Sequence, residues 1–227
     1  QSGIGRYDTE QLTVHMVQHL LLGMAVPLAA VCAAPVTLVL QSGGLGTKAL
    51  LRRALRSRAG GIITHPVVTW ALFGGGLVVI YLTPVLGLSA RHPWVHLLVH
   101  VHLVVSGSLF LAGLVGVDPS PHPMPYGARL LAVLVAVPFH AFLGLAIVTT
   151  RAPLAPSAYP SLSDQHTAGG LLWGMGELFT LVVSAIVFRH WYVYDQREAV
   201  RADRRADNAE AARLEAEARA FDVTPPA

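Results

Sequence analysis

Five apolar runs divide the chain, and polar or proline-rich stretches separate them. The runs lie at residues 11–40, 66–86, 93–116, 128–149 and 167–192. A helix that crosses the roughly 30 Å hydrocarbon core of a bilayer needs about 20 apolar residues. Because each run reaches this length, the pattern predicts an all-α, polytopic transmembrane helical bundle with about five spanning helices.

The third run carries a series of histidines near its start. Residues 91–116 read RHPWVHLLVHVHLVVSGSLFLAGLVG. An α-helix turns about 100° per residue, so His92, His96 and His100 lie on one face while His102 points to nearly the opposite side. Ionisable side chains inside a membrane span are costly and by default indicate function. We therefore expect this helix to form one wall of a metal site.

Composition agrees with a membrane protein and narrows the ligand types. Only 13% of the residues are charged, against about 25% in a typical soluble domain. The single cysteine, Cys32, excludes an intramolecular disulfide and a cysteine-cluster metal site, so a metal would need histidine, methionine or carboxylate ligands. The net charge is +3, but the positive residues are concentrated in two segments, and no nucleic-acid-binding motif is present. We therefore expect a lipid bilayer and no nucleic acid as a partner.

Positive charge predicts the orientation of the bundle. Residues 41–61 contain one lysine, four arginines and no acidic residue, and their spacing predicts a short amphipathic helix at the membrane surface. By the positive-inside rule this segment faces the cytoplasm. Residues 1–10 then form an external lead-in to the bundle of residues 11–192, and residues 193–227 form a charged, solvated cytoplasmic tail. The expected location is the plasma membrane of a bacterial cell.

Six polar residues fall in the outer half of this bundle. They are His15, His19, His96, His100, His140 and Glu177. The first four form two pairs with four-residue spacing, and both rings of such a pair can offer a nitrogen to one ion. His140 is expected about 13 Å, and Glu177 about 15 Å, below the outer ends of their helices. Two facing pairs would make a four-histidine site, with His140 and Glu177 below it as further ligands or as groups that orient the ligands.

The ligand types favour copper, because thiolates are absent and methionines lie nearby; zinc and iron remain open. Structural interpretations stand beside this one. A lone buried histidine such as His140 is as often a core residue bonded to a backbone carbonyl, and Glu177 can pair with a histidine only to reduce the cost of its burial. Met16 and Met24 are more often packing residues than ligands.

Several local features make predictions about packing. Pro27 removes a backbone donor and is expected to kink the first helix. Gly74 to Gly76 predict a close approach to a neighbouring helix, and Gly170 with Gly174 predict the same for the fifth helix. Asp164 precedes the fifth run and is expected to cap that helix.

The order of these motifs is similar to a known family. The motifs are HMVQHLLLGMAVPLA from His15, YLTP from Tyr81, HPWVHLLVHVHLVVSGSLF from His92, DP at Asp118, PFHAFLGL from Pro138 and DQHTAGGLLWGMGE from Asp164. Over about residues 11–192 the sequence resembles the CtaG-like cytochrome c oxidase assembly proteins. The resemblance implies an integral membrane protein associated with copper supply to the oxidase. It also implies further spans before residue 11, and a chain that begins with Gln1 agrees with this expectation.

We therefore expect a membrane copper-binding assembly factor, not an enzyme, that supplies or inserts copper during cytochrome c oxidase biogenesis. Its partners would be oxidase subunits or other copper chaperones, and its metal site would face outward. One alternative is a b-type haem protein in which His100 and His140 bracket the iron. Another is a copper transporter or importer, for which polar residues should continue through the inner half, where only occasional serine and threonine occur.

Overall fold

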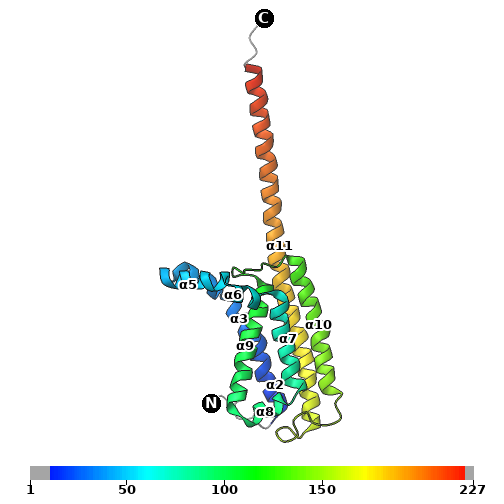
Figure 1. Ribbon diagram of the computed structural model, residues 1–227. Helices are drawn as coiled ribbons and strands as arrows, with labels where there is room; N and C mark the ends of the chain where they lie inside the picture. Colours follow the sequence, from blue (N-terminus) through cyan, green and yellow to red (C-terminus); the bar gives the residue numbers. More distant parts are fainter. Residues whose placement is uncertain (1–10, 223–227) are drawn as a thin grey trace. The chain divides into compact units, whose positions relative to one another are not determined.

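The computed structural model describes residues 11–222, which contain helices and no strand (Figure 1). The predicted external lead-in, residues 1–10, lies outside the described residues. The helices are α2 (Leu12–Leu20), the π-helical η1 (Leu21–Ala25), α3 (Val26–Cys32), α4 (Pro35–Ser42), α5 (Leu45–Arg56), α6 (Arg58–Ile63), α7 (Pro66–Leu82), α8 (Val85–Arg91), α9 (Pro93–Val115), α10 (Tyr126–Val148) and α11 (Leu162–Asp222).

Among the described residues, four helical segments are long and apolar enough to cross a membrane. These are Leu12–Ser42, Pro93–Val115, Tyr126–Val148 and Leu162–Glu217. A fifth results if α7 and α8, which meet at 74°, count as one bent span. The predicted all-α polytopic bundle of about five spans is confirmed.

The second span departs from the straight helix predicted for residues 66–86. α7 ends at Leu82, and the chain turns before α8 begins at Val85. The cause is local, because the residue before a proline is driven out of the α region. Thr83, which precedes Pro84, is extended at φ −128° and ψ 172°. The bend places the end of α7 and the start of α9 at the same end of the bundle (Figure 1).

The first span is also irregular. A π-helical turn, η1, comes just before Pro27, whose missing N–H interrupts the α-helical ladder. The kink expected at this proline therefore takes the form of a π-helical turn. A second break follows at Ala34, which has a positive φ of 50° and precedes Pro35. The predicted helix at residues 41–61 appears as α5 and α6, and the side chain of Ser57 caps α6 by accepting from the Gly60 N–H.

α9 is the central helix of the bundle and contacts α3, η1, α7, α8 and α10. It approaches η1 backbone to backbone, since a Cβ added at Gly107 would collide with the carbonyl oxygen of Gly23. The predicted close approach at the Gly74–Gly76 run is confirmed at its two ends. A Cβ at Gly74 would lie 3.3 Å from the Phe139 ring of α10, and one at Gly76 would meet the His102 ring of α9.

The prediction that Gly170 and Gly174 make the close contacts of the fifth helix is wrong. Added Cβ atoms at Gly170 and Gly174 would meet nothing within 4 Å. The close contacts are made by Gly169, whose Cβ would lie 3.0 Å from the Gly144 carbonyl of α10, and by Gly176, whose Cβ would lie 2.7 Å from the His140 ring. Four-residue spacing alone does not say which face of a helix meets its neighbour.

The chain divides into two compact units, residues 1–187 and residues 188–227. The first holds the bundle and its core. The second begins within α11, and its side chains are almost all exposed through residue 217. It carries ion pairs within the helix, Arg201 to Glu198 at 2.7 Å and Arg213 to Glu217 at 2.9 Å. These features agree with a solvated helical tail.

Candidate metal centre

Four histidines from two helices meet at one end of the bundle, where α2 and α9 both begin beside α8 (Figure 1). The rings of His15 and His96 stack with centroids 5.1 Å apart, and His100 lies edge-on to His19 at 5.4 Å. Within a helix, the two ring centroids are 4.1 Å apart in α2 and 4.0 Å apart in α9. The structure thus brings the two predicted pairs together, and we call these four residues the histidine cluster.

The two histidines of α2 are almost completely buried. His15 is 1% exposed and His19 is 2% exposed. The Nε2 atom of each has no hydrogen-bond partner among the described residues. Leaving a polar atom buried and unpaired costs about 1–3 kcal/mol. Two such nitrogens close together fit a metal cation, because each lone pair can bind it.

The spacing of the ligand atoms is close to what one ion requires. His15, His19 and His96 each offer a ring nitrogen within 4.8 Å of the others. Two nitrogens that bind one ion at about 2 Å stand roughly 3.3 Å apart in a tetrahedral site. A contraction of about 1.5 Å or less would therefore close a three-histidine site. His100 lies beside this group as a fourth donor.

One tyrosine lies beside each histidine of α2. The Tyr81 hydroxyl, at the end of α7, lies 2.9 Å from Nδ1 of His19. With a metal on Nε2, Nδ1 carries the proton and donates to this hydroxyl, which fixes the ring and its tautomer. Tyr159, from the loop before α11, places its ring 5.6 Å from that of His15. Both tyrosines are buried.

Asp164 positions the start of α2. Its carboxylate accepts hydrogen bonds from the Leu12 N–H at 2.6 Å and from the Thr13 N–H and hydroxyl at 3.3 and 2.5 Å. The prediction that Asp164 caps its own helix is therefore wrong. Ser161 caps α11 instead, because its hydroxyl accepts a hydrogen bond from the Asp164 N–H. A carboxylate at the N-terminus of α2 satisfies free donors just ahead of His15.

The loop that carries Tyr159 is held by a buried glutamine. Gln165, 1% exposed, accepts from the Leu154 N–H at 2.7 Å and donates to the Ile147 carbonyl and the Thr150 hydroxyl. His166 next to it contacts the Thr150 carbonyl at 3.4 Å through Nε2. The two residues that follow Asp164 thus both help to fix the loop.

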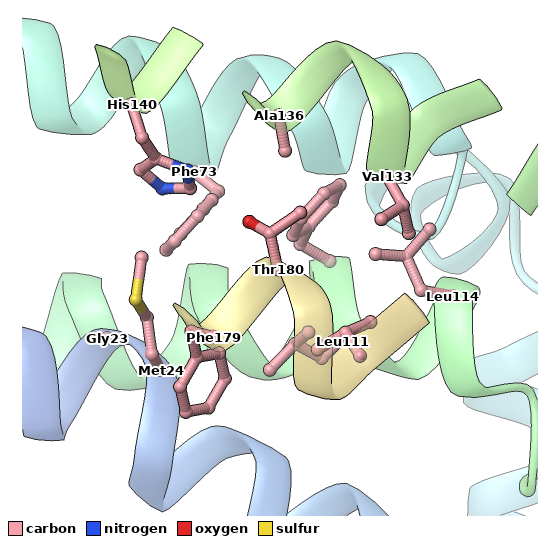
Figure 2. Close-up of a pocket in the computed structure, with 12 residues that line it drawn as sticks. Gly23, Met24, Phe73, Leu111, Leu114, Val133, Ala136, His140, Phe179 and Thr180 are labelled. Atoms are coloured by element: carbon pink, nitrogen blue, oxygen red, sulfur yellow. The ribbon is translucent and has the colours of Figure 1, made fainter. Parts of the chain in front are cut away.

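His140 and Glu177 do not join the ligand atoms that lie within 4.8 Å of one another. His140 lines a separate cavity between α10, η1 and α11 (Figure 2). Its ring lies near the backbone carbonyl of Ala136, one turn earlier, in line with the structural interpretation of a core histidine, but neither ring nitrogen has a partner of good hydrogen-bond geometry among the described residues. Glu177 is half-buried, and its Oε1 likewise has no partner among the residues described.

Sequence reasoning assigned no role to Tyr81 or Tyr159. A signal existed for Tyr81, because it stands near the end of the second run that was predicted to face outward, at the depth expected for the paired histidines. Tyr159 lies in a loop, where no periodicity places a side chain.

Comparisons with known proteins find a matching family and several uncharacterized relatives. The model of the cytochrome c oxidase caa3 assembly factor family (Caa3_CtaG) matches residues 1–193. Uncharacterized proteins of Mycobacterium bovis and Mycobacterium tuberculosis are each 32% identical over 223 residues, which covers 91% of this chain and 34% of the relative. An uncharacterized protein of Mycobacterium leprae is 31% identical with the same coverage. The chain thus spans about a third of the length of these curated relatives. No solved structure matches it.

Proposed function

Because the chain belongs to the cytochrome c oxidase caa3 assembly factor family, we propose that it binds copper at the histidine cluster and supplies it during assembly of the oxidase. The observation that carries the proposal is the geometry of the cluster. Three ring nitrogens lie within 4.8 Å of one another, and two of the rings are buried with an unpaired nitrogen.

The donor set supports copper over the harder ions. Imidazole suits copper, zinc and iron, whereas magnesium and calcium take oxygen ligands. A carrier must also release its ion. Neutral imidazoles without a thiolate hold copper less firmly than cysteines do, and a cluster within the first turns of α2 and α9 lies close to the end of the bundle.

The remaining parts of the proposal concern location and partners. The bundle sits in the bacterial plasma membrane with the histidine cluster toward the outer face. The basic helices α5 and α6 and the C-terminal tail then lie in the cytoplasm. The recipient is an oxidase subunit or another copper chaperone. The protein acts by binding and transfer and catalyses no reaction.

Elemental analysis of purified protein tests the site. Wild type, a variant with His15, His19, His96 and His100 changed to alanine, and a His92→Ala control are loaded with Cu(I) under reducing conditions and then desalted. His92 is the control because it is exposed and precedes α9 outside the cluster. We expect the four-alanine variant to lose at least one equivalent of copper that the other two retain.

Two outcomes would overturn the proposal. One is a folded wild type that takes up neither Cu(I) nor Cu(II). The other is an equal copper content in the wild type and the four-alanine variant. A Soret band in the same preparation would favour the haem alternative. Folding of each variant is checked by circular dichroism and gel filtration.

A cellular measurement tests the assembly role separately. In cells that depend on this chain for oxidase assembly, the four-alanine variant should lower the copper content of the isolated oxidase. The His92→Ala variant should leave it unchanged. An oxidase with full copper in the four-alanine strain would remove the supply role and leave only metal binding.

A further inference from the structure

A small, partly open pocket lies between η1, α7, α9, α10 and α11, apart from the histidine cluster. Its volume is about 30 Å³, more than the roughly 10–15 Å³ that a cavity needs to hold one water molecule. Figure 2 shows His140, Met24 and Thr180 directed into it, with Phe73 and other apolar side chains completing the wall. The space therefore suits a single small guest.

His140 is the least satisfied group in this wall. It is 4% exposed, and both of its ring nitrogens are buried without a hydrogen-bond partner among the described residues. The carbonyl of Ala136, one turn earlier, is close enough to interact with one ring nitrogen, which leaves the other without a partner among the described residues. A buried imidazole nitrogen without a hydrogen bond is costly, so a guest that binds it gains that free energy.

The other two polar atoms of the wall are electron-pair donors. The Thr180 hydroxyl donates its proton to the Gly176 carbonyl at 2.8 Å and therefore offers only a lone pair to the space. Met24 is 6% exposed and brings a soft thioether sulfur. An imidazole nitrogen, a thioether and a hydroxyl lone pair fit a soft cation and would repel an anion.

The surrounding backbone holds the two main donors in place. Met24 lies in the π-helical turn η1, and such turns occur frequently at functional sites. The His140 ring packs against Gly176, where a Cβ would lie only 2.7 Å from its Cγ atom. The absence of a Cβ at this position leaves room for the ring where it lies. A glycine at 176 is therefore required by the ring of His140.

We propose that His140 and Met24 form a second binding site, separate from the histidine cluster, that takes one Cu(I) ion with Thr180 as an additional weak donor. The proposal rests on the proposed function only for the identity of the ion. It makes the bundle a carrier with two stations of different softness, an imidazole site at the end of the bundle and a nitrogen–sulfur site within it.

The test uses the full chain with the four cluster histidines changed to alanine, so that the cluster contributes nothing. Cu(I) is titrated against a chromophoric Cu(I) chelator under anaerobic, reducing conditions. We expect one bound equivalent per chain. Adding Met24→Leu, which nearly conserves side-chain volume, should weaken this binding at least tenfold. Met175→Leu is the matched control, because Met175 is 41% exposed on α11 and does not line the space.

X-ray absorption of the bound copper gives a second readout. A sulfur scatterer should be present in the four-alanine protein and in its Met175→Leu form, and absent after Met24→Leu. His140→Leu should remove the remaining binding. A folded four-alanine protein that binds no Cu(I), or one in which Met24→Leu changes neither affinity nor the sulfur signal, would overturn the second site.

The two proposals fail in different ways. Copper that is lost entirely in the four-alanine variant supports the cluster and overturns the second site. Copper that is unchanged in the four-alanine variant but lost on Met24→Leu overturns the cluster and supports the second site.

Discussion

The two ends of the bundle are closed by the same devices but hold their histidines differently. At the cluster end, Asp164 caps α2 by accepting from the Leu12 and Thr13 N–H groups and the Thr13 hydroxyl. At the other end, Asp118 caps α4 in the same way through Val36 and Thr37. Each loop also has a polar anchor. Gln165 holds the loop before α11, and Arg129 holds the loop before α10 by donating to the Met124 and Val115 carbonyls.

Histidines occur at both ends, and burial distinguishes them. His15 and His19 are at most 2% exposed. His65 and His122 at the other end lie with ring centroids 5.3 Å apart, but both are exposed. Water can satisfy an exposed imidazole, whereas a buried one needs a specific partner. Capping and anchoring thus position a helix end, while burial of unpaired nitrogens makes it a candidate metal site.

The largest expected effect comes from the loop anchors. Gln165→Leu leaves the partly buried Leu154 N–H without its acceptor, so we expect a loss of about 2–3 kcal/mol in the free energy of unfolding. Because the same loop carries Tyr159 against His15, copper affinity should fall as well. Thermal unfolding in detergent and Cu(I) titration measure the two effects.

The matched change at the other end is Arg129→Leu. It should also destabilise the fold, since two carbonyl bonds and the stacking of the guanidinium over Tyr126 are lost. It should leave copper affinity within twofold of wild type. Equal losses of copper affinity in the two variants would mean that affinity follows global stability. The Gln165 loop would then have no specific role in holding the metal site.

The capping aspartates give the next effect in size. Replacing a helix N-cap with alanine costs about 1–2 kcal/mol, and we expect this loss for both Asp164→Ala and Asp118→Ala. Only Asp164→Ala should weaken copper binding, because it frees the start of α2 just ahead of His15. Unfolding and titration are measured on the same preparations. Weaker copper binding in Asp118→Ala would contradict the assignment of the site to the end that Asp164 closes.

Tyr81→Phe is a smaller change confined to one bond. The hydroxyl that contacts Nδ1 of His19 is lost while the ring and its packing remain. Loss of a group that orients a metal-binding histidine typically costs tenfold or more in affinity, and we expect about tenfold here. Tyr126→Phe, outside the cluster, is the matched control. An unchanged affinity in Tyr81→Phe would show that His19 is oriented by packing alone.

The sequence predicted those features that depend on local periodicity. The helices, their apolar lengths and the meeting of the two histidine pairs follow from residue spacing and from depth along each helix. Features that depend on which elements are neighbours could not be predicted. Asp164 caps α2 because the start of α11 lies beside it, and Gly169 packs where Gly170 was expected because of how α10 meets α11.

His140 illustrates the limit most clearly. Its depth suggested that it belongs with the cluster, but depth along a helix fixes only one coordinate. The lateral position of α10 turns the ring toward Met24 and Thr180 instead (Figure 2). Tyr81 was accessible to the same depth reasoning, yet only the bend after Leu82 and the packing of α7 determine that its hydroxyl meets His19.

The smallest effect is expected from the histidines at the other end. His65 uses Nδ1 to accept from the Val67 N–H, which leaves one ring nitrogen, and His122 brings a second. These two form part of no three-residue ligand group among the described residues. Because both rings are exposed to solvent, they carry no desolvation cost that a bound ion could reduce. A double His65→Ala, His122→Ala variant should therefore keep the copper stoichiometry of wild type and change its affinity less than twofold.

The measurement is the same Cu(I) titration, run beside a His15→Ala, His19→Ala variant with the same number of substitutions. If the His65, His122 variant lost an equivalent of copper, then ring proximity without burial would be enough to hold the ion. Burial would then no longer explain why one end of the bundle is the candidate metal site.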